Sequence, residues 1–198
     1  MKTLINFAVI LFFAIAFNGI AYSNDECSFN GIDDVLYFQE NSISNLREIT
    51  VEACVKVNSF SARKSGANEI WQFIIFKKNQ LDHFNEGFAI YLDEKNERFA
   101  TSVASAKGIQ AVIVDKKHSV ELGRWYRLRM SANSKEIKFF VDGVLVKSAP
   151  TGFPLDFDSE ELFIGGRTKI LKDKDFEGRF CGSIKNIKIW SKVLDEDD

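Results

Sequence analysis

The chain is a succession of short apolar segments separated by polar turns. Residues 49–57, ITVEACVKV, show the pattern most clearly, because apolar side chains occupy every second position. One face carries Ile49, Val51, Ala53, Val55 and Val57, and the other carries Thr50, Glu52, Cys54 and Lys56. This alternation predicts a β-strand with one face on a core. Further strands are predicted within 69–76, 107–115, 124–132, 161–166 and 180–194, and 87–103 and 136–149 are each predicted to form two strands joined by a turn.

Within residues 136–149, two apolar runs meet at Asp142-Gly143. Asp-Gly supplies the two positive φ angles of a type I′ turn, so we predict a two-residue hairpin there. No stretch keeps the helical repeat for three turns, and the segments recur at about the spacing typical of β-sandwiches. We therefore predict an all-β protein, a two-layer antiparallel β-sandwich whose core includes strands near residues 34–38 and 183–190. Ile184, Ile187 and Ile189 are predicted to point inward.

The N-terminus differs from the rest of the chain. Lys2 precedes the apolar run LINFAVILFFAIAF, and a small-residue context follows at Ala21-Tyr22-Ser23. This order is typical of a secretory signal peptide, so we predict cleavage after Ser23 and a single domain over residues 24–198. The alternative is an uncleaved membrane anchor, although Asn18-Gly19 interrupts the apolar run. Downstream of it no apolar run is long enough to span a bilayer, so we expect a secreted, extracellular protein without stable membrane insertion.

Charge argues against two classes of partner. The chain has 26 basic and 28 acidic residues, a net charge of −2, and the charges are interleaved. Nucleic acids and anionic membranes call for clustered positive charge, so we expect neither as the main partner.

Seven segments, in their order along the chain, resemble the laminin-G-like jelly-roll domains of the concanavalin A-like lectin/glucanase superfamily, which includes the pentraxins. They are FNGIDDVLYF (29–38), ITVEACVKV (49–57), EGFAIYLDEKNERF (86–99), GRWYRLRMS (123–131), KFFVDGVLV (138–146), LFIGG (162–166) and FCGSIKNIKIWSKVL (180–194). The resemblance implies a concanavalin A-like jelly roll over the whole mature chain. It also implies core positions for Trp125 and Trp190. Trp71 is expected in the core as well, with stacking on a sugar ring as the alternative.

The same resemblance implies a possible calcium site. Some laminin-G-like domains hold calcium near the opening segment, where Asp33 and Asp34 match; the alternative is that these aspartates only form a turn. The pentraxin site is matched only in part, by Asp82, Asn85 and Glu86. Its second half is missing, because Gly-Arg-Thr-Lys at 166–169 replaces the acidic cluster.

Catalytic residues are not expected. Related glucanases carry carboxylates at alternate positions of one strand, but the acidic clusters at 158–161 and 173–177 lack that alternation. His83 and His118 are far apart and lack the spacing of a metal or triad motif. We therefore interpret the protein as non-enzymatic.

Three cysteines in an exported chain allow at most one internal disulfide, and sequence alone leaves the pairing open. By strand parity Cys54 and Cys181 both face outward and Cys27 faces inward, which favours a Cys54–Cys181 bridge. The alternatives are a Cys27–Cys181 bridge or three reduced thiols. An unpaired cysteine could also join chains into an oligomer.

Two functions remain open at this stage. The first is a secreted recognition module that binds a glycan or an extracellular protein through loops or a sheet face, with or without calcium. The second is a structural or matrix component that only assembles and binds no sugar.

Overall fold

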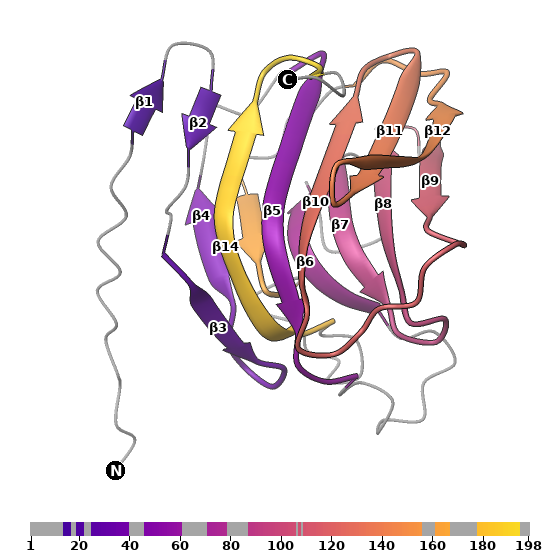
Figure 1. Cartoon of the computed structure of the whole chain (residues 1–198). Coiled ribbons are helices and arrows are strands. Elements are labelled where there is room, and N and C mark those ends of the chain that lie inside the picture. The colour runs from indigo at the N-terminus through magenta and orange to yellow at the C-terminus, as the bar shows by residue number, and fades with distance from the viewer. Residues whose placement is uncertain are drawn as a thin grey trace.

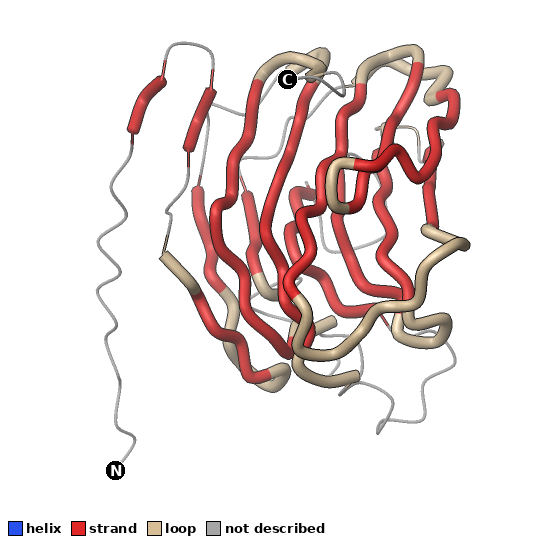
Figure 2. The backbone as a smooth tube through the Cα atoms, in the orientation of Figure 1, coloured by secondary structure: helices blue, strands red, loops and turns tan. Residues whose placement is uncertain are grey.

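The computed structural model describes residues 14–16, 19–21, 25–39, 46–60, 71–78, 87–105, 107, 109–155, 161–166 and 178–194. Within these ranges every regular element is a β-strand (Figure 2). The strands are β1 Ala14–Ala16, β2 Gly19–Ala21, β3 Cys27–Asn30, β4 Leu36–Gln39, β5 Ile49–Val57, β6 Trp71–Lys78, β7 Gly87–Asp93, β8 Arg98–Ala104, β9 Gln110–Val114, β10 Trp125–Ala132, β11 Glu136–Val141, β12 Val144–Pro150, β13 Glu161–Ile164 and β14 Cys181–Trp190.

The strands form two antiparallel sheets, one in front of the other in Figure 1. Sheet A has eight strands in the order β1-β2-β14-β5-β10-β11-β12, with β3 also paired to β14. Sheet B has six strands in the order β4-β13-β6-β7-β8-β9. Neighbours in sheet A such as β14 and β5 are far apart in sequence, which is the long-range pairing of a jelly roll. The predicted two-layer antiparallel β-sandwich is confirmed.

One core lies between the sheets, as the strand alternation predicts. In β5 the side chains of Ile49, Val51, Ala53, Val55 and Val57 are all fully buried in it. Sheet B contributes a matching apolar layer from its inner face, and all of these side chains belong to one contiguous cluster. Burial of such a layer supplies the main stabilisation of a sandwich.

The hairpin between β11 and β12 is the one that the Asp-Gly pair predicts. Asp142 and Gly143 have φ angles of 53° and 82°, and Val141 pairs directly with Val144 across the two-residue turn. Positive φ at both central positions is the signature of the type I′ turn. Asp142 therefore acts as a turn residue.

A β-bulge in β14 explains how three isoleucines of mixed parity reach the core. Ile184 and Ile189 are 0% and 1% exposed, and Ile187 is 8% exposed, although simple alternation would turn Ile187 away from Ile184. The register with β5 shifts between Lys185 and Lys188. The extra residue turns the strand back to the core. The predicted inward orientation of all three is confirmed.

A second apolar cluster covers the outer face of sheet B. Phe73, Phe76 and Phe163 are buried there, and Trp71 and Tyr91 pack against the cluster. The rings of Trp71 and Tyr91 lie 6.0 Å apart at 61°, an edge-to-face contact. Burial, with a smaller effect of Asp93, raises the pKa of Tyr91 to about 12. Trp71 is thus half-buried outside the central core, where it packs against other aromatic rings.

The predicted signal peptide lies only in part within the described residues. There, β1 and β2 form a hairpin, and β2 pairs with β14 at Lys188 and Ile189. Cleavage after Ser23 stays a prediction. No helix among the described residues has the length and apolar character needed to cross a membrane.

Candidate binding site on the outer face of the larger sheet

The outer face of sheet A presents polar and charged side chains because the apolar members of each strand point the other way. In register, Trp125 of β10 lies opposite Lys56 of β5, and Lys56 lies opposite Ser183 of β14. The neighbouring row brings together Arg127, Cys54 and Lys185. Cations, hydroxyls and one indole are therefore gathered from three strands that are remote in sequence.

Trp125 is the centre of this arrangement. The ammonium group of Lys185 lies 4.1 Å from the centre of the ring, and that of Lys56 lies 4.8 Å from it. Both distances are within the range of cation–π attraction. Because β5 separates β10 from β14, the ring must reach across β5 to meet Lys185. The expected core position of Trp125 is wrong: its neighbour Tyr126 takes the inward position, and Trp125 is half-buried outside.

A carboxylate of the chain itself lies against the two lysines. Glu26 Oε1 is 3.3 Å from Lys56 Nζ, and the Ser183 hydroxyl also hydrogen-bonds to Glu26. These two hydrogen bonds, Ser183 first, together with the charges of Lys56 and Lys185, lower the pKa of Glu26 below its ordinary value of 4.5. We call Glu26, Lys56, Trp125, Ser183 and Lys185 the Trp125 patch. It already holds one carboxylate.

Arg127 extends the positive charge toward the β11–β12 hairpin. A Cβ atom added to Gly143 would lie 2.7 Å from Arg127 Nη2, so the guanidinium group rests against the glycine of the turn. The Arg127 backbone N–H donates to Asp142 Oδ1 at 2.8 Å, which ties the hairpin tip to β10. Beside Arg127, the amide of Asn186 lies 3.8 Å from the Cys54 sulfur. Asn186 has a φ of 53° and lies inside the β14 bulge.

The other end of the same face is closed. Arg129 Nε donates to Glu52 Oε2 at 2.9 Å, and both side chains are about one-tenth exposed. Beyond this ion pair, the C-terminal segment crosses the sheet, because Thr50 Oγ1 donates to the Lys192 carbonyl and accepts from the Leu194 N–H. On the part of this face formed by β14, β5 and β10, the accessible polar groups therefore lie at the Trp125 patch and Arg127.

Trp190 lies on this closed end. It pairs with Thr50, whose side chain points outward, so Trp190 is also outside the core and is half-buried. The expectation of a core position is wrong for Trp190 for the same reason as for Trp125: both take the outward parity of their strand.

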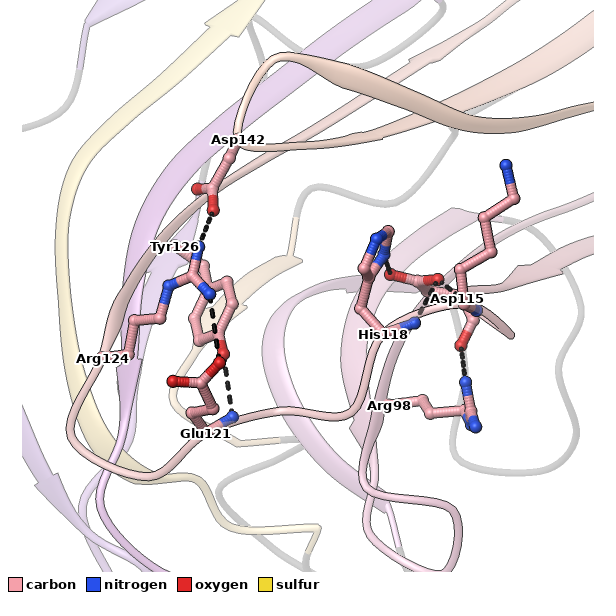
Figure 3. Close-up of polar contacts among 8 residues, drawn as sticks. Arg98, Asp115, His118, Glu121, Arg124, Tyr126 and Asp142 are labelled. Carbon is pink, nitrogen blue, oxygen red and sulfur yellow. Dashed lines mark hydrogen bonds and ion pairs between the residues drawn. The ribbon is translucent and has the colours of Figure 1, made fainter.

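The loop between β9 and β10 borders the patch and is fixed at both ends (Figure 3). At its β10 end, Arg124 Nη2 lies 2.9 Å from Asp142 Oδ2 and its Nη1 lies 3.3 Å from Glu121 Oε1. The Glu121 backbone N–H donates to the Tyr126 hydroxyl at 2.8 Å. Tyr126, Asp142 and Glu121 together raise the pKa of Arg124, in that order of effect. These contacts hold the loop against the hairpin tip.

At the β9 end of the loop, Asp115 is the acceptor for several donors (Figure 3). Its Oδ1 accepts from the backbone N–H groups of Lys117 and His118, and its Oδ2 lies 3.0 Å from His118 Nδ1. Arg98 Nη1 donates to the Asp115 carbonyl at 3.0 Å. The Asp115 side chain is only 2% exposed, whereas that of His118 is 60% exposed. A buried carboxylate with its oxygens so engaged organises the loop.

Asp33 and Asp34 form a turn centred on Asn30. The Asn30 side-chain oxygen accepts from the backbone N–H groups of Ile32, Asp33 and Asp34. In return, Asp34 Oδ2 accepts from the Asn30 backbone N–H and Asp33 Oδ1 from its side-chain amide. Among the described residues no group of three or more acidic, histidine or cysteine side chains converges as a metal site. Calcium binding at Asp33 and Asp34 stays a prediction. Asp82, Asn85 and Glu86 lie outside the described residues.

The three cysteines are free thiols in the structure. Cys54 pairs with Lys185, four positions along β14 from Cys181, or roughly 13 Å at the rise of a strand. Cys27 pairs with Ile184, three positions from Cys181, and packs against the core as its parity predicts. Neither the Cys54–Cys181 nor the Cys27–Cys181 bridge is formed in this arrangement, since bridged Cα atoms lie within about 7 Å. Peptide mapping without reduction tests the pairing.

Sequence reasoning did not single out Lys56, Lys185 or Glu26. The alternation placed Lys56 on an outward face, but nothing local shows that β14 and β10 flank β5. Parity also places Lys185 on the outer face of its strand, but it does not show that Lys185 meets Trp125. The patch is a product of register between distant strands, which one sequence does not display.

Fold and site together define a class: a jelly-roll β-sandwich with a polar, aromatic-centred face on its larger sheet. A model of the laminin G type, described as the concanavalin A-like lectin/glucanases superfamily, matches residues 30–198. The chain belongs to this family, which confirms the resemblance seen in the sequence.

Solved structures agree on the fold. The binding domain of botulinum neurotoxin serotype D superposes with a TM-score of 0.65 at 14% identity, over 87% of this chain and 40% of that one. The heptameric SAP-like pentraxin of Limulus polyphemus gives 0.63 at 14% identity, over 90% and 78%. The CBM40 of a Ruminococcus gnavus sialidase gives 0.63 at 14% identity, over 88% and 96%. This chain thus spans well under half of the neurotoxin domain. A sequence search of curated proteins finds no match.

Proposed function

We propose that this chain is the precursor of a secreted, non-enzymatic recognition module that binds a glycan or an extracellular protein through the Trp125 patch. The observation that carries the proposal is an indole on an outer sheet face with ammonium groups 4.1 and 4.8 Å from its centre. An amphipathic ring among polar groups is typical of binding surfaces. The neurotoxin structure, which is named a binding domain, supports the proposal through the shared fold.

The charges on this face support a binding role in preference to a hydrolytic one. Hydrolysis of glycosides by paired carboxylates needs one of them free to donate a proton. On the described outer face of sheet A, Glu26 is engaged by Lys56, Glu52 by Arg129 and Glu136 by Lys138. Each of these carboxylates is paired with a cation, an arrangement that suits electrostatic positioning of a ligand.

The test is binding by residues 24–198, with and without calcium, on an array of glycans and extracellular proteins. We expect binding that Trp125→Ala abolishes. Trp71→Ala is the matched control, because Trp71 is also a half-buried indole but lies on the outer face of sheet B, and it should leave binding intact. Absence of any bound glycan or protein, together with a disulfide-linked dimer on non-reducing gels, would favour a structural assembly protein instead.

A further inference from the structure

Resting on the proposed function, we propose that the ligand is a carboxylated saccharide. Its carboxylate binds Lys56 and Lys185 in the place that the Glu26 carboxylate occupies in the free protein.

The first support is the internal carboxylate itself. Glu26 accepts from the Ser183 hydroxyl and lies 3.3 Å from Lys56 Nζ, and Lys185 also acts on its charge. The patch thus already seats a carboxylate in contact with one ammonium group, and the positive charge of a second acts on it. Charge-assisted hydrogen bonds of this type are stronger than neutral ones, so the same donors would hold a ligand carboxylate.

The second support is an excess of positive charge. Two ammonium groups face one carboxylate within the patch, and Arg127 of the adjoining row adds a third cation, whose guanidinium group rests against Gly143. A cluster of this kind attracts an anion, while the net charge of −2 over the whole chain gives no general attraction for polyanions such as nucleic acids. The charge complementarity is therefore local to the Trp125 patch and Arg127.

The third support is the fixed position of the cations. Trp125 lies against both ammonium groups, and it is anchored on a strand whose neighbouring residues are buried in the core. Free lysine side chains are flexible and lose conformational entropy when a ligand orders them. Lysines already held against a ring lose less entropy on binding, so binding costs less free energy. The indole and the exposed Ser28 hydroxyl, which lies 3.4 Å from the buried Ser183 hydroxyl, then offer apolar and hydrogen-bonding contacts to the sugar ring.

Glu26 is suited to be displaced. Its side chain is 43% exposed, and it lies just before β3, so it can turn outward without disturbing a strand. A ligand must compete with it, which makes Glu26 an internal inhibitor of binding. Removal of its charge should therefore strengthen binding. Damage to the fold would weaken binding instead, so a gain cannot be explained by misfolding.

The experiment compares saccharides of equal length by calorimetry on residues 24–198. A hyaluronan hexasaccharide carries carboxylates and chitohexaose carries none; sialyllactose and lactose form a second pair. We expect binding of the carboxylated member of at least one pair, at least tenfold tighter than its neutral partner and weakened by salt. Lys56→Met and Lys185→Met should each weaken it about tenfold, and Glu26→Gln should strengthen it severalfold. Lys147→Met, which removes the same charge from exposed β12, should change nothing.

Several outcomes would overturn the inference. They are equal binding of neutral and carboxylated members, binding only of a sulfated saccharide that carries no carboxylate, such as sucrose octasulfate, and indifference to Lys56→Met and Lys185→Met in folded protein. Weaker binding by Glu26→Gln would also count against it. In these cases a ligand is bound and the recognition function stands. If no saccharide and no extracellular protein binds at all, the proposed function fails as well.

Discussion

Single glycines decide how closely the two sheets approach. Gly165 has a φ of 78°, and a Cβ there would lie 2.1 Å from the ring of Phe29, which is itself 5% exposed. Gly152 has a similar φ of 72° but no atom within 4 Å. We expect Gly152→Ala to lower the free energy of unfolding by about 1 kcal/mol through backbone strain alone. Gly165→Ala should cost at least about 2 kcal/mol more in urea unfolding, and equal losses would contradict the close packing.

The Glu26 carboxylate should make stability depend on pH. Because the folded protein lowers its pKa, its contribution is complete above about pH 4.5 and is lost as the pH falls through the folded-state pKa. The difference in melting temperature between wild type and Glu26→Gln should therefore be present at pH 7 and vanish below that window. A difference that is constant with pH would mean that Lys56 and Ser183 do not stabilise the charged form.

Asp33 and Asp34 allow a direct test of the calcium prediction. A bound cation stabilises the folded state by mass action, so calcium should raise the melting temperature relative to chelator if these carboxylates bind it. Asp33→Ala should then abolish the rise, while Asp25→Ala, an exposed acidic control nearby, should not. Identical melting curves in calcium and chelator would leave the aspartates as residues of the Asn30 turn.

At the scale of elements, the β14 bulge is the feature on which both core and patch depend. It returns Ile187 to the core and leaves Lys185 facing Trp125. Ile187→Asp should lower the free energy of unfolding by roughly 3 kcal/mol or more, because a charge would enter apolar surroundings. Ser191→Asp adds the same charge at an exposed position past the strand end and should change stability little. Equal effects would mean that the strand does not bulge as described.

At the scale of the molecule, the predicted signal peptide leads to a testable prediction about localisation. Expressed in a secreting cell, the full chain should yield a released protein whose mass corresponds to an N-terminus at Asn24, as the Ala21-Tyr22-Ser23 context predicts. Replacing Ser23 with a bulky Arg should block or shift this cleavage. Retention of the unmodified chain in the membrane fraction at full mass would support the membrane anchor instead.

The pattern of residues along the chain determined the strands, the turn at Asp142-Gly143 and the sandwich. These depend on properties of neighbours in sequence: alternation selects the buried face of β5, and Asp-Gly is suited to positive φ. Even the inward set of β14 was predictable, although the bulge that reconciles its parity was not. The family likewise followed from the order of local motifs.

The tertiary structure alone decided which outward side chains meet. Trp125, Lys56 and Lys185 lie on strands that are adjacent only because β14 and β10 both pair with β5. The sequence carries each residue's parity but not the register between distant strands, and in a sheet a shift of one residue reverses the face of every side chain. For that reason the Trp125 patch appears only in the folded chain, although the outward position of Trp125 itself follows from the parity of β10.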